Sequence, residues 1–270
     1  MTAAAELVRG RELLVNLTLR ELRGKFKRTA LGWTWSMLNP LSSIVIFTIV
    51  FSTFLGGIAP TGNPSELKNF TLWLTCGLLP WNFTNNGVQA SLGSLVGNSN
   101  LIKKVYFPRE YIVASSVLSW LVTFGIEMIV LCVVFLFFGQ VVFVWIPVVL
   151  VFMALQMIMV LGIALLLAAV NVYFRDVQHF VGIGMQVWFY LTPIVYQTAV
   201  VHQHLTRPWA RKLYSLNPMI RFTDAYRNCF YDGRLPPVQT FVGCAVAALS
   251  MFFIGWAVFS RLEPRFAEEL

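Results

Sequence analysis

The sequence predicts an all-α integral membrane protein with six membrane-spanning helices, and three observations support this fold class. Apolar residues make up 57% of the 270 residues and charged residues only 12%, with a mean hydropathy of +0.70. An ordinary soluble domain has about 25% charged residues. The apolar residues gather in six segments, each able to reach the roughly 20 residues that a span needs. Lipid must therefore cover apolar surface that a chain of this size cannot bury against itself.

The N-terminal segment, residues 6 to 28, is predicted to form a basic amphipathic helix. Its apolar residues recur at helical spacing and define one stripe: Val8, Val15, Leu19, Leu22 and Phe26. The cations fall on the other side of the helix. Such a helix suits the membrane interface, where anionic lipid attracts cations, and a solvated cytosolic helix is the alternative.

The six predicted spans follow in order and contain few charged residues. They cover residues 37–58, 69–92, 111–138, 142–170, 179–200 and 238–260. Gly77 and Pro80 interrupt the second span, and Gly182, Gly184 and Pro193 interrupt the fifth. These two are accordingly the least regular of the six.

The distribution of Lys and Arg predicts the orientation of the spans. Thirteen cations fall in the N-terminal segment, the loops at 93–110 and 171–178 and the C-terminal segment, against seven on the opposite side. The positive-inside rule then places both termini in the cytoplasm. Six of the seven outer cations lie in the loop 201–237, which indicates that this loop is structured.

The sequence carries no motif for catalysis of its own. It has no GxxxxGK[ST], HExxH or GxSxG, so ATP would have to be hydrolysed by a partner chain. Its cations flank apolar spans, which argues against nucleic acid as a partner. His202 and His204 form an HxH pair, read either as a metal site or as a solvated loop.

Glu127 is the one acidic residue in the middle of a predicted span. A carboxylate there is costly unless it is protonated or paired. We expect either a structural hydrogen bond, with Ser119, Thr123 or Gln156 as partners, or a functional role. A functional role would suit a membrane-embedded enzyme acting on polyprenyl lipids or a secondary transporter, the two alternatives to an ATP-driven exporter.

Two inner loops have a composition typical of contact with a cytosolic motor. In residues 98–109, NSNLIKKVYFPR, apolar residues alternate with Lys103 and Lys104, and Pro108 ends the predicted docking helix. In the second loop, Arg175 and Asp176 follow a long apolar span. They are expected to form an ion pair, cap the next helix or meet a partner.

Five sequence stretches carry a family resemblance as well. They are TALGWTWSMLNP at 29–40, NLIKKVYFPRE at 100–110, YFRD at 173–176, LTPIVY at 191–196 and LNPM at 216–219. In this order they resemble the permease subunits of ABC exporters for lipid-linked polysaccharides, a group that includes O-antigen, teichoic acid and actinobacterial galactan exporters. The resemblance covers nearly the whole chain and is nearest to the galactan type.

The resemblance implies a type-2 ABC exporter architecture in the bacterial inner membrane. It implies a homodimer with two ATP-binding subunits, which bind ATP and Mg, and no cofactor in this chain. The substrate would be a polyprenyl-diphosphate-linked glycan, with membrane lipids around the protein. The chain would divide into an interface helix with a Leu-Gly loop (1–36), a six-span domain (37–260) with short outer gate helices, and a cytoplasmic tail (261–270).

The resemblance also implies roles for particular residues. Coupling to the ATPase falls to Asn100, Leu101, Ile102, Lys103, Lys104, Val105, Tyr106, Phe107, Pro108 and Arg109, with Arg175 and Asp176. Entry of the lipid diphosphate falls to Arg23, Lys25, Lys27, Arg28, Leu31 and Gly32. For each of these cations, ordinary positive-inside anchoring is the alternative.

The remaining candidates lie toward the outer side. The outer gate would include Trp209, Tyr214, Asn217, Pro218 and Arg227. A channel for sugars should offer aromatic faces and modest polar groups, and the candidates are Trp73, Trp81, Phe83, Trp188, Tyr190 and Tyr196. A lipid-interface belt or a packed core is the alternative for each of these aromatic residues.

Overall fold

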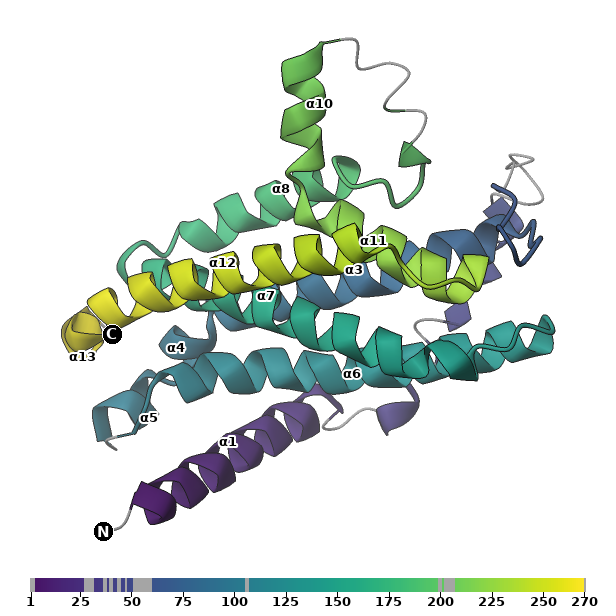
Figure 1. Ribbon diagram of the computed structural model, residues 1–270. Coiled ribbons are helices and arrows are strands. Elements are labelled where there is room, and N and C mark those ends of the chain that lie inside the picture. The colour runs from purple at the N-terminus through teal and green to yellow at the C-terminus, as the bar shows by residue number, and fades with distance from the viewer. Residues whose placement is uncertain are drawn as a thin grey trace.

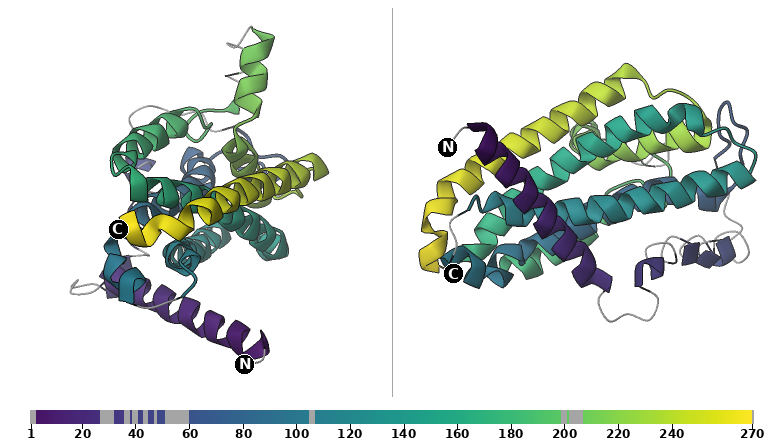
Figure 2. Two further views of the ribbon diagram at one scale, coloured as in Figure 1. Left: turned by 90° about the vertical axis from the view of Figure 1, so that its left-hand side faces the viewer. Right: turned by 90° about the horizontal axis from the view of Figure 1, so that it is seen from below.

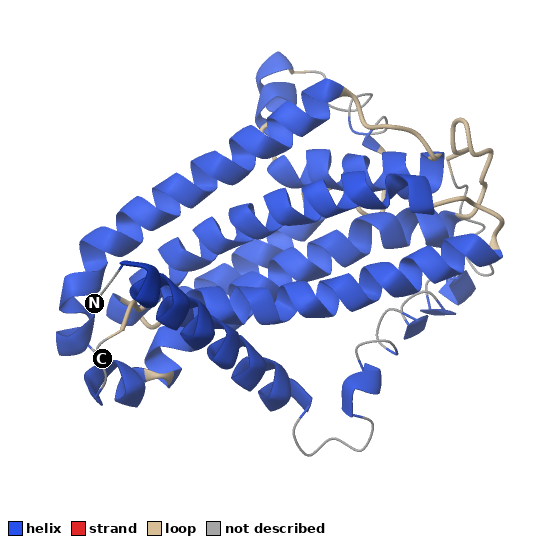
Figure 3. Ribbon diagram, turned by 60° about the horizontal axis from the view of Figure 1, so that its bottom comes forward, coloured by secondary structure: helices blue, strands red, loops and turns tan. Residues whose placement is uncertain are grey.

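The protein is a bundle of long α-helices. The computed structural model describes residues 3–26, 32–35, 38, 41–42, 45–46, 48–50, 60–104, 107–198, 201 and 207–269, and no strand occurs within these ranges (Figures 1 and 3). The first predicted span, 37–58, falls mostly outside the described residues. The number of spans therefore stays a prediction.

Long helices run alongside one another and form the body of the bundle (Figure 1). They are α3 (Phe70–Leu92), α6 (Glu110–Phe137), α7 (Ile146–Tyr173, preceded by the 3-10 turn η3, Phe143–Trp145) and α12 (Val238–Leu262). Among the described helices, three are long and apolar enough to cross a membrane: 110–137, 143–173 and 238–265. Their positions match the apolar segments of the sequence because apolar runs of this length form helices in lipid.

Helix α8 (Val177–Tyr190) is shorter than the fifth predicted span. It has 14 residues, and the chain from Leu191 to Gln197 is irregular, so the prediction of a helix over 179–200 is wrong at 191–197. Pro193 explains the early end, because proline lacks an N–H and disfavours helical backbone at the residue before it. Apolar composition alone did not reveal this end.

Short helices close the two ends of the bundle. At the end predicted to face outward, named the outer end here, are α10 (Pro208–Ser215), α11 (Pro218–Arg227) and the π-turn η4 (Asn228–Asp232), and α10 stands away from the body (Figures 1 and 2). At the opposite end, predicted to face the cytoplasm and named the inner end, are α4 (Ser94–Gly97), α5 (Ser99–Lys104), η5 (Glu263–Arg265) and α13 (Phe266–Glu269). Helix α3 is central, since it contacts α6, α7, α8 and α11.

The core between α3, α6, α7 and α11 combines stacked rings with one polar network. Phe83 stacks on Phe124 with ring centroids 4.9 Å apart. Gln156 donates to the Pro80 carbonyl at 2.7 Å and to the Thr84 hydroxyl at 2.9 Å, while its own oxygen accepts from the Tyr226 hydroxyl at 2.9 Å. Gln156 thereby satisfies polar groups around the helix-breaking Pro80.

Helices α7 and α12 cross at a pair of glycines. A Cβ on Gly255 would collide with the Gly162 carbonyl, and a Cβ on Gly162 would collide with the backbone of Met251. Small residues at such a crossing let two helix backbones approach closely, which is how helices associate where lipid surrounds them.

Helix α1 (Ala3–Phe26) packs obliquely against α6 (Figure 2). Leu17 and Leu22 are buried, whereas Val15 and Leu19 of the predicted stripe are 47% and 41% exposed. The packing face is therefore turned away from the centre of that stripe. Val15 and Leu19 stay open on the flank of α1, where an interface helix would meet lipid.

Candidate functional site

Two of the motifs found in the sequence, LTPIVY and LNPM, meet at the outer end of the bundle. The side-chain nitrogen of Asn217 donates to the Leu191 carbonyl at 3.1 Å and the Thr192 hydroxyl at 3.0 Å. Its oxygen accepts from Trp188 Nε1 at 2.8 Å and caps α11 by accepting from the Met219 N–H at 3.0 Å. Asn217 thus joins the end of α8 to the start of α11.

Arg227 clamps the same region from inside. Its guanidinium donates to the carbonyls of Trp73 at 3.3 Å, Pro193 at 2.7 Å and Ile194 at 2.8 Å, and lies 3.5 Å from the centre of the Trp73 ring. The side chain is buried. Within the predicted outer gate, Arg227 holds α3, α11 and the bend after α8 together, and its role in a gate stays a prediction.

The other predicted gate residues differ in their surroundings. Trp209 on α10 is 62% exposed, while Tyr214 is half-buried and Pro218 begins α11. The hydroxyl of Tyr196 donates to the Tyr190 carbonyl at 2.7 Å. The gate predicted at 201–237 is thus one projecting helix, α10, and one packed helix, α11.

The six predicted channel aromatics do not form one surface. Phe83 is 1% exposed inside the protomer, so its assignment to a channel for sugars is wrong and the packed-core alternative holds. Trp73 lies against the Arg227 guanidinium. Trp81 packs edge-on against Trp188 with ring centroids 5.6 Å apart.

Trp81 and Tyr190 face a common cavity between α3 and α8. It has a volume of about 340 Å³, and its side chains carry no charge. Its walls are aromatic, amide, apolar and glycine residues: Trp81, Phe189, Tyr190, Asn85, Gln89, Gln186, Met185 and Gly182. Rings beside amides are the combination expected for contact with sugars.

At the inner end, α5 presents the two lysines of the predicted docking helix. Lys103 and Lys104 are exposed, while Ile102 is buried and anchors the turn. Val105 and Tyr106 lie outside the described residues. The exposed pair leaves two cations at the inner surface, available to a partner.

The C-terminal residues 263–269 fold back against this region as a hook. Phe266 is fully buried and packs against Phe259 and Tyr173 with ring centroids 5.4 and 6.3 Å apart. Arg109 donates to the Glu263 carbonyl, and the Tyr173 hydroxyl donates to the Leu262 carbonyl at 3.0 Å. The predicted cytoplasmic tail is thus a folded element that touches both inner loops.

Arg175 and Asp176 are exposed in the turn between α7 and α8. The ion pairs of the described residues do not include them, and the Asp176 side chain makes no capping hydrogen bond to α8. Two of the three expectations for this pair are therefore wrong. Contact with a partner remains a prediction.

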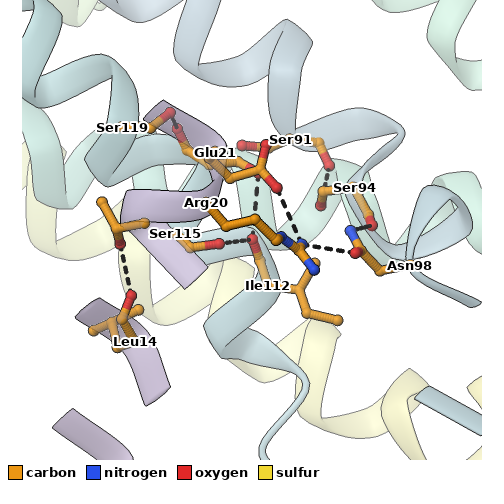
Figure 4. A network of polar contacts seen from close by, with 11 residues as sticks. Leu14, Arg20, Glu21, Ser91, Ser94, Asn98, Ile112, Ser115 and Ser119 are labelled. Atoms are coloured by element: carbon orange, nitrogen blue, oxygen red, sulfur yellow. Dashed lines mark hydrogen bonds and ion pairs between the residues drawn. The ribbon is translucent and has the colours of Figure 1, made fainter. Parts of the chain in front are cut away.

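Helix α1 is tied to the residue just before α5 (Figure 4). Arg20 Nη2 donates to Asn98 Oδ1 at 2.7 Å and pairs with Glu21 at 3.1 Å. Asn98 in turn donates to the Ser94 carbonyl at 2.8 Å. The interface helix and the docking segment are thereby linked directly.

Lys25 lies in the contact between α1 and α6. Its Nζ is 3.5 Å from the centre of the Trp120 ring, and neither this Nζ nor Trp120 Nε1 has a hydrogen-bond partner. Burial lowers the pKa of Lys25 from 10.5 to about 7, against the opposing effect of the Glu21 and Glu127 carboxylates. Lys25 therefore docks α1, which differs from its predicted place among cations that meet a lipid diphosphate.

The other predicted residues of the lipid-diphosphate entry are only partly described. Arg23 is exposed on α1, and Gly32 has a positive φ of 50°. Lys27, Arg28 and Leu31 lie outside the described residues.

The expected hydrogen bonds of Glu127 are wrong. Ser119 and Thr123 donate to carbonyls of their own helix, at 2.8 and 3.2 Å, and Gln156 binds the Pro80 network. Glu127 is buried, and its charge acts on Lys25 across the α1–α6 contact. Its place is thus structural, opposite the docked interface helix.

Comparison with known proteins decides the family. The model of the ABC-2 type transporter family matches residues 12–231. The chain belongs to the ABC-2 type transporter family. Helices α3, α6, α7, α8 and α11 fall within the matched range, which begins inside α1.

Several curated proteins resemble this ABC-2 type transporter over nearly their whole length. An O-antigen export system permease protein, RfbA, of Myxococcus xanthus is 27% identical over 98% of both chains. One of the same name from Klebsiella pneumoniae is 30% identical over 96% of this chain and 95% of the relative. The polysialic acid transport protein KpsM of Escherichia coli is 22% identical over 92% of both chains.

Sequence reasoning missed three parts of this ABC-2 type transporter. No partner was predicted for Asn98 in the docking segment, and no role was predicted for Tyr226 in the outer loop. Phe266 lies in a charged C-terminal stretch, EPRFAEE, where a lone aromatic residue between charges was the available signal of a buried anchor.

Proposed function

We propose that this chain is the permease subunit of an ATP-driven exporter that moves a polyprenyl-diphosphate-linked polysaccharide from the cytoplasm to the outer face of the bacterial inner membrane. It would act as a homodimer with two ATP-binding subunits, which would supply ATP and Mg. The observation that carries the proposal is the similarity over 98% of both chains to a protein named as an O-antigen export permease. The galactan type is the proposed subgroup, on the resemblance of the motifs.

The inner end of the bundle supports coupling to an ATPase. Lys103 and Lys104 are exposed on a short helix whose Ile102 is buried, and Asn98 just before it is bound to α1. A push on α5 would pass directly to α3 through α4, and to α1 through Asn98. Closure of the ATP-binding subunits would in this way rock the long helices.

The cavity between α3 and α8 supports a path for sugars. Its uncharged wall offers the Trp81 ring together with the amides of Asn85, Gln89 and Gln186. Such a wall can contact C–H faces and hydroxyls in turn without a tight, charged site that would hold the polymer. Trp81, Trp188 and Tyr190 remain in the proposed path, and Phe83 does not.

The interface helix supports a role at the lipid end of the substrate. Arg23 is exposed on α1, which also presents part of its apolar stripe. A guanidinium at the inner interface can bind a diphosphate through two hydrogen bonds at once. Arg23, with Lys27, Arg28 and the Leu31–Gly32 pair ahead of the first span, is the proposed entry site.

Affinity purification from the native host tests the function. We expect an ATP-binding subunit to co-purify with the tagged chain, and depletion of the chain to leave lipid-linked glycan on the cytoplasmic side. If no ATP-binding subunit co-purifies and the glycan still reaches the outer side, the proposal fails. Turnover by the purified chain alone would instead favour a membrane-embedded enzyme.

Charge reversal of the docking helix tests the coupling. The double variant Lys103→Glu, Lys104→Glu should lose association with the ATP-binding subunit about tenfold or more, because two exposed attractive charges become repulsive. Lys68→Glu, at an exposed position on the other side, is the matched control. Unchanged association and export in the double variant would remove these lysines from the mechanism.

A further inference from the structure

A second cavity, of about 470 Å³, lies at the outer end of the bundle. The loop before α3, the first turn of α3, the bend after α8, the α11–η4 segment and the start of α12 all contribute to its wall. Its volume falls in the range of sites that hold small molecules. It is separate from the cavity between α3 and α8, and the two have no lining residue in common.

Three of the four charged side chains in this wall are already paired or hydrogen-bonded. Arg234 forms an ion pair with Asp232 at 3.1 Å and donates from Nε to Asn228 Oδ1 at 2.9 Å. The guanidinium of Arg227 donates hydrogen bonds to three main-chain carbonyls. None of these groups needs a ligand.

Asp224 is the exception. Its side chain lines the cavity from α11, and within the described part of the chain its carboxylate has neither an ion pair nor a hydrogen bond. Burial raises its pKa from 3.8 to about 6, while the charge of Arg227 acts in the opposite direction. The Asp224 side chain is half-buried, so its carboxylate oxygens stay open to water or to a ligand in the cavity.

The other residues that line the cavity indicate the chemical class of ligand that it can bind. Two carboxylates and two guanidiniums balance, so the cavity has no net charge to attract an ion. A metal ion would find one free carboxylate and two cations, and an anion would face Asp224. The same cavity is lined by the amide residues Asn63 and Gln197, by threonines and by Trp73. A neutral ligand with several hydroxyls, which donate to carboxylates and accept from amides, fits this wall.

We propose that this outer cavity binds a sugar unit, with the Asp224 carboxylate accepting hydrogen bonds from two neighbouring hydroxyls. The inference rests on the proposed function in naming the source of the sugar: the exported glycan, as it emerges at the outer face. The Trp73 edge and Asn63 would hold the sugar ring. Because Gln197 belongs to the bend that Arg227 holds, the site would lie next to that bend.

Binding to the assembled exporter tests the inference. The permease and its ATP-binding subunits are placed together in lipid nanodiscs, and the probe is the water-soluble oligosaccharide released from the host's lipid-linked glycan by mild acid. Saturation-transfer NMR and calorimetry measure binding. A methyl glycoside of each component sugar serves as a second probe, which separates a single-unit site from one that needs the polymer.

Two variants alter the cavity and one does not. Asp224→Asn keeps the size of the side chain and removes the charge, and should weaken binding about tenfold. Thr240→Trp fills the cavity from α12 and should abolish binding. Glu66→Gln, at an exposed outer position that does not line the cavity, is the matched control and should bind as the unaltered protein does. Assembly with the ATP-binding subunits checks that each variant folds.

The possible results distinguish failure of the proposed sugar site from failure of the proposed export function. The cavity is not a sugar site if the oligosaccharide binds equally well to the assembled Asp224→Asn and Thr240→Trp variants. The same conclusion holds if the unaltered complex exports the glycan but does not bind the oligosaccharide. In both cases the export function stands. If the unaltered complex fails to export, the function fails. Binding that depends on Asp224 in either probe supports the site.

Discussion

At the scale of single residues, Arg227 shows how a buried charge is held without a carboxylate. Its planar guanidinium carries five donors, and three main-chain carbonyls from two segments receive hydrogen bonds from them. The Pro193 and Ile194 carbonyls lie in the irregular bend and would otherwise lack this donor, whereas the Trp73 carbonyl belongs to the helical turn of α3. The clamp therefore depends on the shape of arginine as much as on its charge.

Replacing Arg227 should destabilise the outer end of the bundle. Arg227→Met leaves the Pro193 and Ile194 carbonyls without this donor and should cost about 3 to 5 kcal/mol, and Arg227→Lys should cost less but still lower the melting temperature. Thermal unfolding of the detergent-purified protein measures both. Lys212→Met, at an exposed site on α10, should stay within about 0.5 kcal/mol. A melting temperature unchanged by Arg227→Met would contradict the clamp.

Lys25 makes the docking of α1 depend on pH. The docked helix favours the neutral amine, because burial lowers its pKa to about 7, whereas released α1 returns Lys25 toward its ordinary value of 10.5. Below pH 7 both states are protonated and the docked state bears the full cost of burial. Docking should therefore strengthen as the pH rises from about 7 toward about 10.

Amide hydrogen-exchange protection factors of α1 measure this dependence. They should increase between about pH 6 and about pH 9 beyond the change seen in α7, which serves as an internal reference. Lys25→Met removes the titrating group and should flatten the profile. A profile of the unaltered protein as flat as that of the variant would show that Lys25 does not control docking.

At the scale of elements, long apolar runs were predictable, but the effect of each proline was not: helix α3 continues through Pro80, whereas α8 ends before Pro193. The helices at 110–137, 146–173 and 238–262 follow directly from uniform apolar composition, and the helix at 70–92 is less apolar. Helix α8 ends at Tyr190 although apolar residues continue, because Pro193 overrides composition. For α1, apolar periodicity predicts a helix with one apolar stripe. The face that packs on α6 also contains Lys25, and apolar periodicity cannot identify a lysine in a packing face.

The same limit applies to the site residues. Exposed positions such as Lys103 and Lys104 were predictable, because charge next to a span belongs at the inner surface. Phe83 and Arg227 were assigned to a channel and a gate, yet both are buried by tertiary contacts with residues far away in the sequence. Burial of this kind depends on the partner helices, and one sequence does not reveal those partners.

The crossing of α7 and α12 should be intolerant of side chains. In Gly255→Ala the new Cβ would overlap the Gly162 carbonyl, so the two backbones must separate. We expect a loss of about 2 kcal/mol or more, measured as a lower melting temperature or a lower yield of folded permease. Gly125→Ala in α6, where a Cβ meets no atom within 4 Å, is the control and should be neutral. Equal stability of the two variants would contradict close packing at the crossing.

At the scale of the whole molecule, one hook connects parts that lie far apart in the sequence. Phe266 packs on Tyr173, which precedes one inner loop, while Arg109 at the end of the other inner loop binds the Glu263 carbonyl. The two loops proposed to meet the ATPase are thereby held in one arrangement. A motor pressing on α5 would then move the inner ends of α6, α7 and α12 together.

Phe266→Ala should loosen this arrangement without unfolding the bundle. Removing a fully buried ring is expected to cost about 3 kcal/mol locally. The measured consequence should be less glycan exported per ATP hydrolysed in the reconstituted complex, while association with the ATP-binding subunit persists. Phe253→Ala, at an exposed position on α12, is the control. Full coupling in Phe266→Ala would limit the hook to a structural role.

The clamp at Arg227 also has a consequence for the history of the family. A guanidinium that binds only main-chain carbonyls does not depend on which side chains the bend 191–198 carries. That bend can accept substitutions and keep its anchor, provided that its backbone follows the same path. An ancestral exporter could in this way have changed the chemistry of its outer mouth, one side chain at a time, as its cargo changed.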